Sequence, residues 1–367
     1  MKNRKDIGCV EGNAKSIIIM KVFSLIQAFF VCWIFFTGCD SKVNTETSTK
    51  QVPKADSVRA ESKPVEPVIA PSKTLDTALY NKLQIYLSQG DTTGRWPVKH
   101  AHPNEGAVLP FKRIVAYYGN LFSTRMGVLG EYPKDIMLAK LQQEVDKWNK
   151  ADSVTPAIPA LHYIAVTAQL EPGKGGKYRL RMPFRHVDTL LNWAKPINGL
   201  VFMDVQIGLS TLQEELPPME AYLSKPEVHL GIDPEFSMQT GAKPGTRIGS
   251  MDADDVNYAI DYLASLVKKH QLPPKILVVH RFTQKMLSGY KQIKLVPEVQ
   301  VVICMDGWNR PANKANTYRQ YVYKEPVQFT GFKIFYKNDA EKVGLKEVMQ
   351  PEQVLKLTPK PIYIQYQ

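Results

Sequence analysis

The stretch VHLGIDPEFSM, residues 228–238, joins a short apolar run typical of a buried strand to two carboxylates one residue apart. Successive side chains of a strand point to opposite faces, so Asp233 and Glu235 are expected to project to the same side, and Pro234 blocks further strand pairing. Two acids are therefore predicted together at the end of a strand. The structural alternative for Asp233 is a turn or a helix cap, because an Asp-Pro pair is common at such positions.

From residue 111 onward, short β-rich runs alternate with helical stretches, which is the pattern of a parallel α/β sheet. The run at 228–232 is the fourth of eight strand candidates, and the others are 113–118, 161–168, 199–205, 275–280, 300–305, 329–335 and 362–366. Helices are expected between the strands at 134–150, 187–195, 212–224, 253–270, 283–291, 313–321 and 340–357. Eight such units predict an α/β fold, a (β/α)8 TIM-like barrel over 111–367. An open doubly wound sheet is the alternative, although the dinucleotide and phosphate-loop fingerprints are missing.

The barrel predicted in this way lacks a C-terminal eighth helix, because the sequence ends directly after the eighth strand candidate. Apolar residues at helical spacing predict an N-terminal helix over 74–88. We expect this helix to pack in the gap beside the first and eighth strands. The rest of the 74–110 segment, from residue 91, is rich in turn-forming residues and receives no assignment.

Residues 1–73 are expected to export and anchor the chain. The apolar run VFSLIQAFFVCWIFF, residues 22–36, has the length of a signal-peptide core, and the tetrad Phe-Thr-Gly-Cys ends at Cys39. This tetrad resembles the lipobox of bacterial lipoproteins, although the lipobox usually begins with Leu. The resemblance implies a signal peptide over 1–38, with Met20 as an alternative start, lipidation of Cys39 and a flexible tether over 39–73. A transmembrane anchor is the alternative.

Composition and charge are those of an ordinary globular protein with a basic surface. The chain has 44% apolar and 22% charged residues, and its net charge is +12. Because the Lys and Arg residues are scattered and form no basic cluster, no nucleic-acid partner is expected. Cys9 and Cys32 lie in the predicted signal region and Cys39 in the lipobox, so Cys304 alone remains as a thiol of the mature chain. No intrachain disulfide framework is therefore expected.

In a parallel barrel the C-terminal ends of the strands meet at one mouth, which is where such folds keep their chemistry. Four acids follow strand candidates and are the predicted catalytic residues: Glu235, Asp306, Asp204 and Asp233. Polar and aromatic neighbours at the same ends are predicted to bind substrate: Tyr117, Tyr118, Glu131, Gln206, His280, Arg281, Trp308, Lys333 and Gln365. The structural alternatives are that Asp204 caps the following loop, that Asp306 starts a turn, and that His280 and Arg281 are ion-pair partners.

Acids on different strands, with aromatic neighbours, suit glycoside hydrolysis. That reaction needs one carboxylic acid to protonate the leaving oxygen and a second carboxylate on another support to attack or stabilise the sugar, or to activate water. We assign the general acid/base to Glu235 and the nucleophile or base to Asp306 or Asp204, with Asp233, His280 and Arg281 tuning their protonation.

The scaffold over 111–367 and its acidic positions resemble barrel glycoside hydrolases, many of which place an acid after strand four and a second after strand six or seven. No specific hydrolase family is matched. The chitinase-type DxxDxDxE run is represented only by its final three residues at 233–235, and Lys333 stands on strand seven where many of these enzymes have Glu. The resemblance implies an exported, membrane-anchored lipoprotein of the bacterial cell envelope that hydrolyses a glycan.

Other functions remain open. A non-catalytic glycan-binding or scaffold lipoprotein is the chief alternative, and it is favoured if the acids are locked in salt bridges with Arg281 or Lys333. A metal-dependent hydrolase comes third: the His100-Ala-His102 pair lies ahead of the first strand, and an oxygen-ligated ion at the acids stays open. No metal site and no cofactor is assigned. Lys333 as a Schiff-base nucleophile is the weakest alternative.

Overall fold

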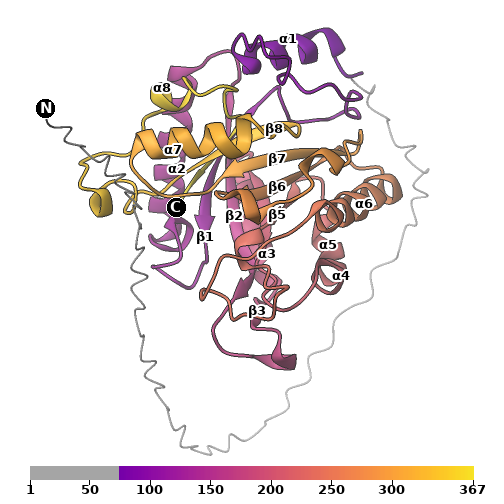
Figure 1. Cartoon of the computed structure of the whole chain (residues 1–367), viewed down its shortest axis with the longest axis vertical. Coiled ribbons are helices and arrows are strands. Elements are labelled where there is room, and N and C mark those ends of the chain that lie inside the picture. The colour runs from indigo at the N-terminus through magenta and orange to yellow at the C-terminus, as the bar shows by residue number, and fades with distance from the viewer. Residues whose placement is uncertain (1–73) are drawn as a thin grey trace, which may run out of the picture. The chain divides into compact units, whose positions relative to one another are not determined.

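The computed structural model describes residues 74–367, so the predicted signal peptide, the lipobox Cys39 and the tether lie outside the described residues. Eight parallel strands follow one another around a closed barrel in the order β1-β2-β4-β5-β6-β7-β8-β9, and β9 pairs with β1 to close it (Figure 1). The predicted barrel is confirmed. The strands are β1 (Arg113–Gly119), β2 (Ala157–Ala168), β4 (Leu200–Val205), β5 (Val228–Ile232), β6 (Lys275–Arg281), β7 (Val299–Met305), β8 (Phe329–Ile334) and β9 (Tyr363–Tyr366). A short strand that the sequence analysis did not predict, β3 (Arg179–Arg181), pairs antiparallel with the end of β2.

Strand alternation sorts the side chains into two apolar layers. Ile114 and Ala116 of β1 belong to a cluster inside the barrel, whereas Val115 and Tyr117 belong to a larger cluster between the strands and the outer helices. Every residue of the eight barrel strands is buried except one at the start of β4 and three in β2. Because the strands are covered on both faces, their sequences are nearly continuous apolar runs. Position along a strand therefore decides whether a polar side chain faces the barrel axis.

Helices cover the outside of the barrel. Four of the predicted helices form over most of their length: α2 (Lys134–Ala151), α3 (Arg185–Ala194), α6 (Ala253–His270) and α7 (Pro311–Tyr318). Helix α6 begins at a complete capping box, in which the Asp252 side chain accepts from the backbone of Asp255 and the Asp255 side chain accepts from that of Asp252. The remaining short helices are α4 (Leu212–Glu215), α5 (Glu220–Leu223) and α8 (Pro351–Val354).

Three predicted helices were wrong in extent. The segment 212–224 divides into α4, a 3₁₀ turn and α5, because Pro217 and Pro218 cannot continue the hydrogen-bond ladder. The segment 283–291 holds only two 3₁₀ turns, separated at Gly289, whose φ is 69°. The segment 340–357 is interrupted at Gly344 with a φ of 72°, and only α8 is helical beyond it.

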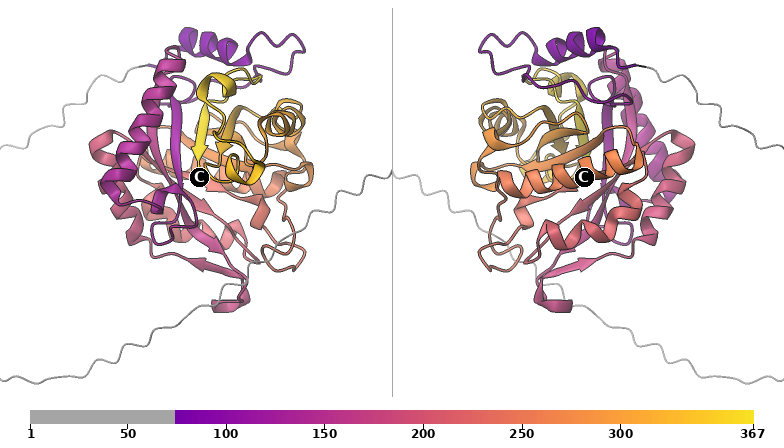
Figure 2. Two further views of the ribbon diagram at one scale, coloured as in Figure 1. Left: turned by 90° about the vertical axis from the view of Figure 1, so that its left-hand side faces the viewer. Right: turned by 90° about the vertical axis from the view of Figure 1, so that its right-hand side faces the viewer.

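Helix α1 (Thr77–Ser88) lies beside the start of β9 and covers the N-terminal end of the barrel (Figures 1 and 2). The backbone N–H of Lys360, just ahead of β9, donates to the carbonyl of Leu87 at 2.8 Å. The Tyr86 hydroxyl donates to Asp152, ahead of β2, at 2.9 Å. Tyr80 and Leu87 pack into the inner apolar cluster, so α1 closes the end of the barrel opposite the mouth.

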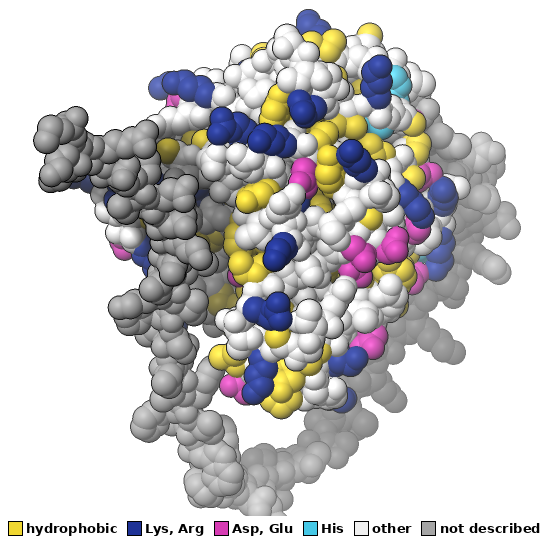
Figure 3. All heavy atoms as spheres, in the orientation of Figure 1, with side chains coloured by type: hydrophobic (Ala, Val, Ile, Leu, Met, Phe, Trp, Pro, Cys, Tyr) yellow, Lys and Arg dark blue, Asp and Glu magenta, His cyan; other side chains and the backbone are white. Residues whose placement is uncertain are grey.

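Positive charge is dispersed on the face of the molecule that Figure 3 shows. On the face seen in Figure 3, Lys and Arg side chains stand singly or in small groups among uncharged ones. Among residues 74–367, no helix combines the length and apolar character needed to cross a membrane.

Candidate active site

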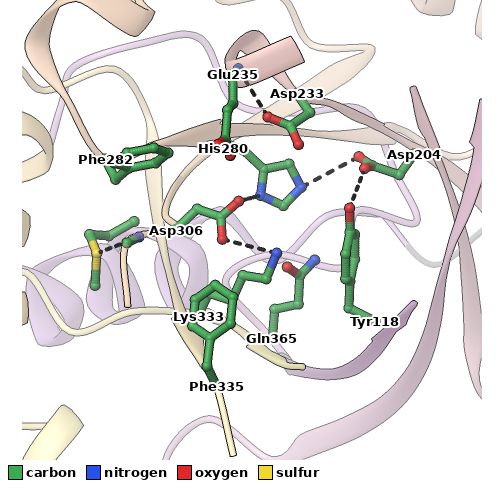
Figure 4. A network of polar contacts seen from close by, with 12 residues as sticks. Tyr118, Asp204, Asp233, Glu235, His280, Phe282, Asp306, Lys333, Phe335 and Gln365 are labelled. Atoms are coloured by element: carbon green, nitrogen blue, oxygen red, sulfur yellow. Dashed lines mark hydrogen bonds and ion pairs between the residues drawn. The ribbon is translucent and has the colours of Figure 1, made fainter. Parts of the chain in front are cut away.

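The C-terminal strand ends bring a dense group of polar side chains to the barrel axis (Figure 4). Nine of the sequence-predicted residues lie in this group, which we call the mouth cluster: Tyr118, Asp204, Gln206, Asp233, Glu235, His280, Asp306, Lys333 and Gln365. Almost all are buried, whereas Glu235 is partly exposed. Strand alternation explains their convergence, because each strand contributes its last inward position or a residue within the next three.

Asp204, at the end of β4, accepts contacts from three sides. The Tyr118 hydroxyl donates to its Oδ2 at 2.9 Å, and the Nε2 atoms of His162 and His280 lie 3.3 and 3.4 Å from its Oδ1. Burial opposes ionisation, but the two histidines outweigh it and hold the pKa of Asp204 below its usual range. Asp204 is thus a fully buried carboxylate and has no exposed surface from which to reach a substrate.

His280 joins Asp204 to Asp306. Its Nδ1 lies 3.0 Å from Oδ2 of Asp306, whose Oδ1 lies 2.9 Å from the Lys333 ammonium. Burial disfavours charge on both side chains. The neighbouring carboxylates nevertheless raise the pKa of His280, and the cations Lys333 and His280 lower that of Asp306. In this arrangement Asp306 is held as a carboxylate.

The acid pair that ends β5 has a different environment. Asp233 is an N-cap: its Oδ1 accepts the backbone N–H of Glu235 at 3.1 Å, so the strand ends at Ile232 and a 3₁₀ turn begins. Burial raises the pKa of Asp233 well above its ordinary value. Burial, then repulsion from Asp306, raises the pKa of Glu235 to about 7. Glu235 forms no ion pair with any of residues 74–367, so a proton can reside on it near neutral pH.

Four predicted binding residues lie apart from the mouth cluster. Tyr117 and Arg281 face outward because each neighbours an inward residue on its strand; the Arg281 guanidinium donates to four backbone carbonyls and pairs with Glu325 at 2.6 Å. Glu131 pairs with Lys337 at 2.7 Å in the loop after β1. Trp308, after β7, is 48% exposed with the Lys342 ammonium 5.4 Å from its ring centroid.

Sequence reasoning missed two members of the group, His162 of β2 and Tyr363 of β9. The Tyr363 hydroxyl lies 2.6 Å from Nδ1 of His162, and the amide of Gln365 lies within hydrogen-bond distance of both side chains. His162 lies in the middle of β2 and Tyr363 is the first residue of β9, so neither stands at the C-terminal end of its strand. The available signal was alternation, because His162 occupies an inward position two residues after the inward Ala160.

His162, Asp204 and His280 also form the one group of three that could hold a metal ion among the residues that the structure describes. Their donor atoms all lie within 4.8 Å of one another, and all three side chains are fully buried. The predicted pair His100 and His102 lies near α1, where the two rings flank Tyr80.

No family model and no curated protein sequence matches the chain. Among solved structures, the chain is similar to the GH26-CBM35 β-(1,4)-mannanase of Podospora anserina, with 11% identity, a TM-score of 0.35, and coverage of 83% of this chain and 64% of that one. It is also similar to a ruminal GH26 endo-β-1,4-mannanase, with 12% identity, a TM-score of 0.34, and coverage of 83% and 66%. The chain thus spans about two thirds of the length of either mannanase.

Proposed function

We propose that the barrel mouth hydrolyses glycosidic bonds, with Glu235 as the general acid and Asp306 as the nucleophile or base. One observation carries the proposal: two acids that follow different strands of one mouth have contrasting electrostatic environments. Glu235 follows β5 without an ion pair among residues 74–367, whereas Asp306 follows β7 in contact with the Lys333 ammonium. Two carboxyl groups with contrasting environments are the arrangement that glycoside hydrolysis uses.

The protonated Glu235 would donate to the leaving oxygen as the bond to the sugar breaks. A pKa of about 7 suits this role, because the proton is present near neutral pH and is released readily in the transition state. Asp306 would attack the sugar carbon or take a proton from the attacking water. Asp204 is removed from this step, because its side chain is fully buried, whereas Asp306 keeps a small exposed surface.

Aromatic side chains at the mouth suit a sugar substrate. Phe282, after β6, and Phe335, after β8, lie beside the mouth cluster in Figure 4, and Trp308 presents an exposed ring outside that cluster, after β7. Apolar ring faces stack on the C–H faces of sugars, and their burial on binding contributes to affinity. The glycan is thus expected to lie across the ends of β6, β7 and β8.

The decisive variant is Glu235→Gln, which keeps the shape of the side chain and removes its titratable proton. Loss of general acid catalysis lowers release of reducing sugar from a panel of polysaccharides by about 100- to 10,000-fold, while polysaccharide binding persists. Glu131→Gln, at the rim, is the matched control and retains activity. Equal hydrolysis by the Glu235→Gln variant and the wild type would exclude Glu235 as the acid.

A non-catalytic glycan-binding protein is the second candidate. It is favoured by the ion pair between Lys333 and Asp306, because a salt bridge that locks an acid of the mouth opposes a catalytic role for that acid. In that case Asp306 serves to neutralise Lys333 and to present a fixed hydrogen-bonding surface. The two functions separate on one result: a binder releases no sugar from any polysaccharide in the panel and still retains one of them in affinity electrophoresis.

We further propose that the chain is a lipoprotein of the bacterial cell envelope, tethered to a membrane through Cys39. The sequence supports this through the apolar run 22–36 and the lipobox-like tetrad that follows it. The glycan substrate would then be one that reaches the membrane surface.

A further inference from the structure

Three buried side chains at the base of the mouth cluster direct nitrogen and oxygen atoms at one point. They are Nε2 of His162, Oδ1 of Asp204 and Nε2 of His280, from β2, β4 and β6. None of these atoms has a hydrogen bond of acceptable geometry to any residue in the part of the chain that the structure describes. A buried polar atom without a partner is costly, and a metal ion at the point they share would displace the proton of His280 and satisfy all three atoms.

We propose that this point is a binding site for a divalent transition-metal ion of the zinc type, held by His162, Asp204 and His280. The Oδ1 atom lies 3.3 and 3.4 Å from the two nitrogens. Tetrahedral zinc with bonds near 2.1 Å places its ligand atoms about 3.4 Å apart, so these two separations match. Two imidazoles and one carboxylate are a donor set that zinc accepts, and the remaining position is left to water.

The groups behind the ligands support the same conclusion. A metal-binding histidine usually presents its other ring nitrogen to a carboxylate or another hydrogen-bonding group, which fixes the ring. Nδ1 of His280 lies 3.0 Å from Asp306, and Nδ1 of His162 lies 2.6 Å from the Tyr363 hydroxyl. Both rings are thereby aimed with Nε2 at Asp204.

Space for the cluster comes from Gly231 of β5. A Cβ atom at this position would lie 2.4 Å from Oδ1 of Asp204 and 2.5 Å from Nε2 of His162. The strand that crosses the cluster therefore presents backbone alone to the ligand atoms, which leaves them free to converge.

The test is metal binding by the full chain after treatment with EDTA and its removal. Calorimetric titration with Zn²⁺ is expected to show one ion per chain with a Kd of about 1 μM or tighter, and Mg²⁺ is expected not to compete. Co²⁺ in place of Zn²⁺ is expected to give the intense visible absorption of a tetrahedral complex. Neither readout depends on hydrolysis, so this result and that of the proposed function are independent.

Asp204→Asn tests the assignment, because it keeps the shape of the side chain and removes its charge. It is expected to weaken Zn²⁺ binding at least about 100-fold. Asp233→Asn, a buried acid of the same mouth outside the three, and His102→Gln, an exposed histidine near α1, are the matched controls and leave binding unchanged. His280→Gln is a second ligand variant should Asp204→Asn fail to fold by circular dichroism. Absence of Zn²⁺ binding by the wild type, or binding lost with His102→Gln and kept with Asp204→Asn, overturns the proposal.

Discussion

Glu235 and Asp233 are both acids and are separated by a single residue, yet their environments differ. Asp233 is buried and caps the turn that ends β5, whereas Glu235 is partly exposed and has no cationic partner among residues 74–367. Both have raised pKa values, chiefly because burial disfavours the charged form. Of the two, Glu235 is accessible enough to give its proton to a substrate.

The pKa of Glu235 predicts the pH dependence of hydrolysis. Below pH about 7 the acid carries its proton and is active, and above it the protonated fraction falls about tenfold per pH unit, so kcat/KM declines with the same slope. The measurement is kcat/KM against pH for the EDTA-treated chain. An aryl glycoside with an acidic phenol as leaving group serves as the control, because it needs no protonation and its rate is expected to stay level. An alkaline decline that persists in Glu235→Gln would contradict the assignment.

For single residues, the sequence predicted which acids reach the mouth: Asp204, Asp233, Glu235 and Asp306 all do so. It could not predict their partners, because a pairing such as His280 with both Asp204 and Asp306 depends on the spacing of strands far apart in the chain. Strand ends were identified by composition, and composition alone does not tell whether a given side chain faces the barrel axis or the outer helices.

Some helices and strands are determined by their own sequence, whereas other segments depend on contacts with the rest of the barrel. The eight strands were predicted from β-rich runs and α6 from the helical stretch at 253–270, because both signals lie within the segment itself. The segments 283–291 and 340–357 have helical composition, but Gly289 and Gly344 adopt positive φ and interrupt them. The loops that form instead are held by contacts to the barrel, such as those of the Arg281 guanidinium with the carbonyls of the 283–291 segment. The sequence of a segment alone does not reveal such contacts.

The interior of β5 gives a prediction about stability. Gly231→Ala places a methyl group against Asp204 and His162, both fixed by further contacts, and is expected to lower the free energy of unfolding by about 1–3 kcal/mol. Gly331→Ala, on the inward face of β8, is the matched control: its added Cβ would lie 3.0 Å or more from its neighbours, so its cost is smaller. Urea denaturation followed by circular dichroism compares the two. A Gly231→Ala variant as stable as Gly331→Ala would show that the cluster can shift.

In the described part of the chain, helix α1 and the mouth cluster lie at opposite ends of the barrel. Helix α1 follows the first described residues and covers the N-terminal end, with Tyr80 and Leu87 in the inner cluster (Figure 2). The mouth cluster lies at the C-terminal ends of the strands. The described part of the chain therefore begins, at residue 74, beside the end of the barrel opposite the proposed active site.

This separation, combined with the lipobox-like tetrad, predicts the behaviour of a Cys39→Ser variant. Without lipidation the protein is expected to move from the detergent phase to the aqueous phase in detergent phase separation, and to lose labelling by a radioactive fatty acid. Cys304→Ser is the matched control, since this thiol is buried in β7 and leaves partition unchanged. Because α1, the first described helix, lies at the end of the barrel away from the mouth, anchored and released forms are expected to hydrolyse a soluble polysaccharide at equal rates. A Cys39→Ser protein that still partitions with detergent would instead indicate that the apolar run 22–36 itself remains as the anchor.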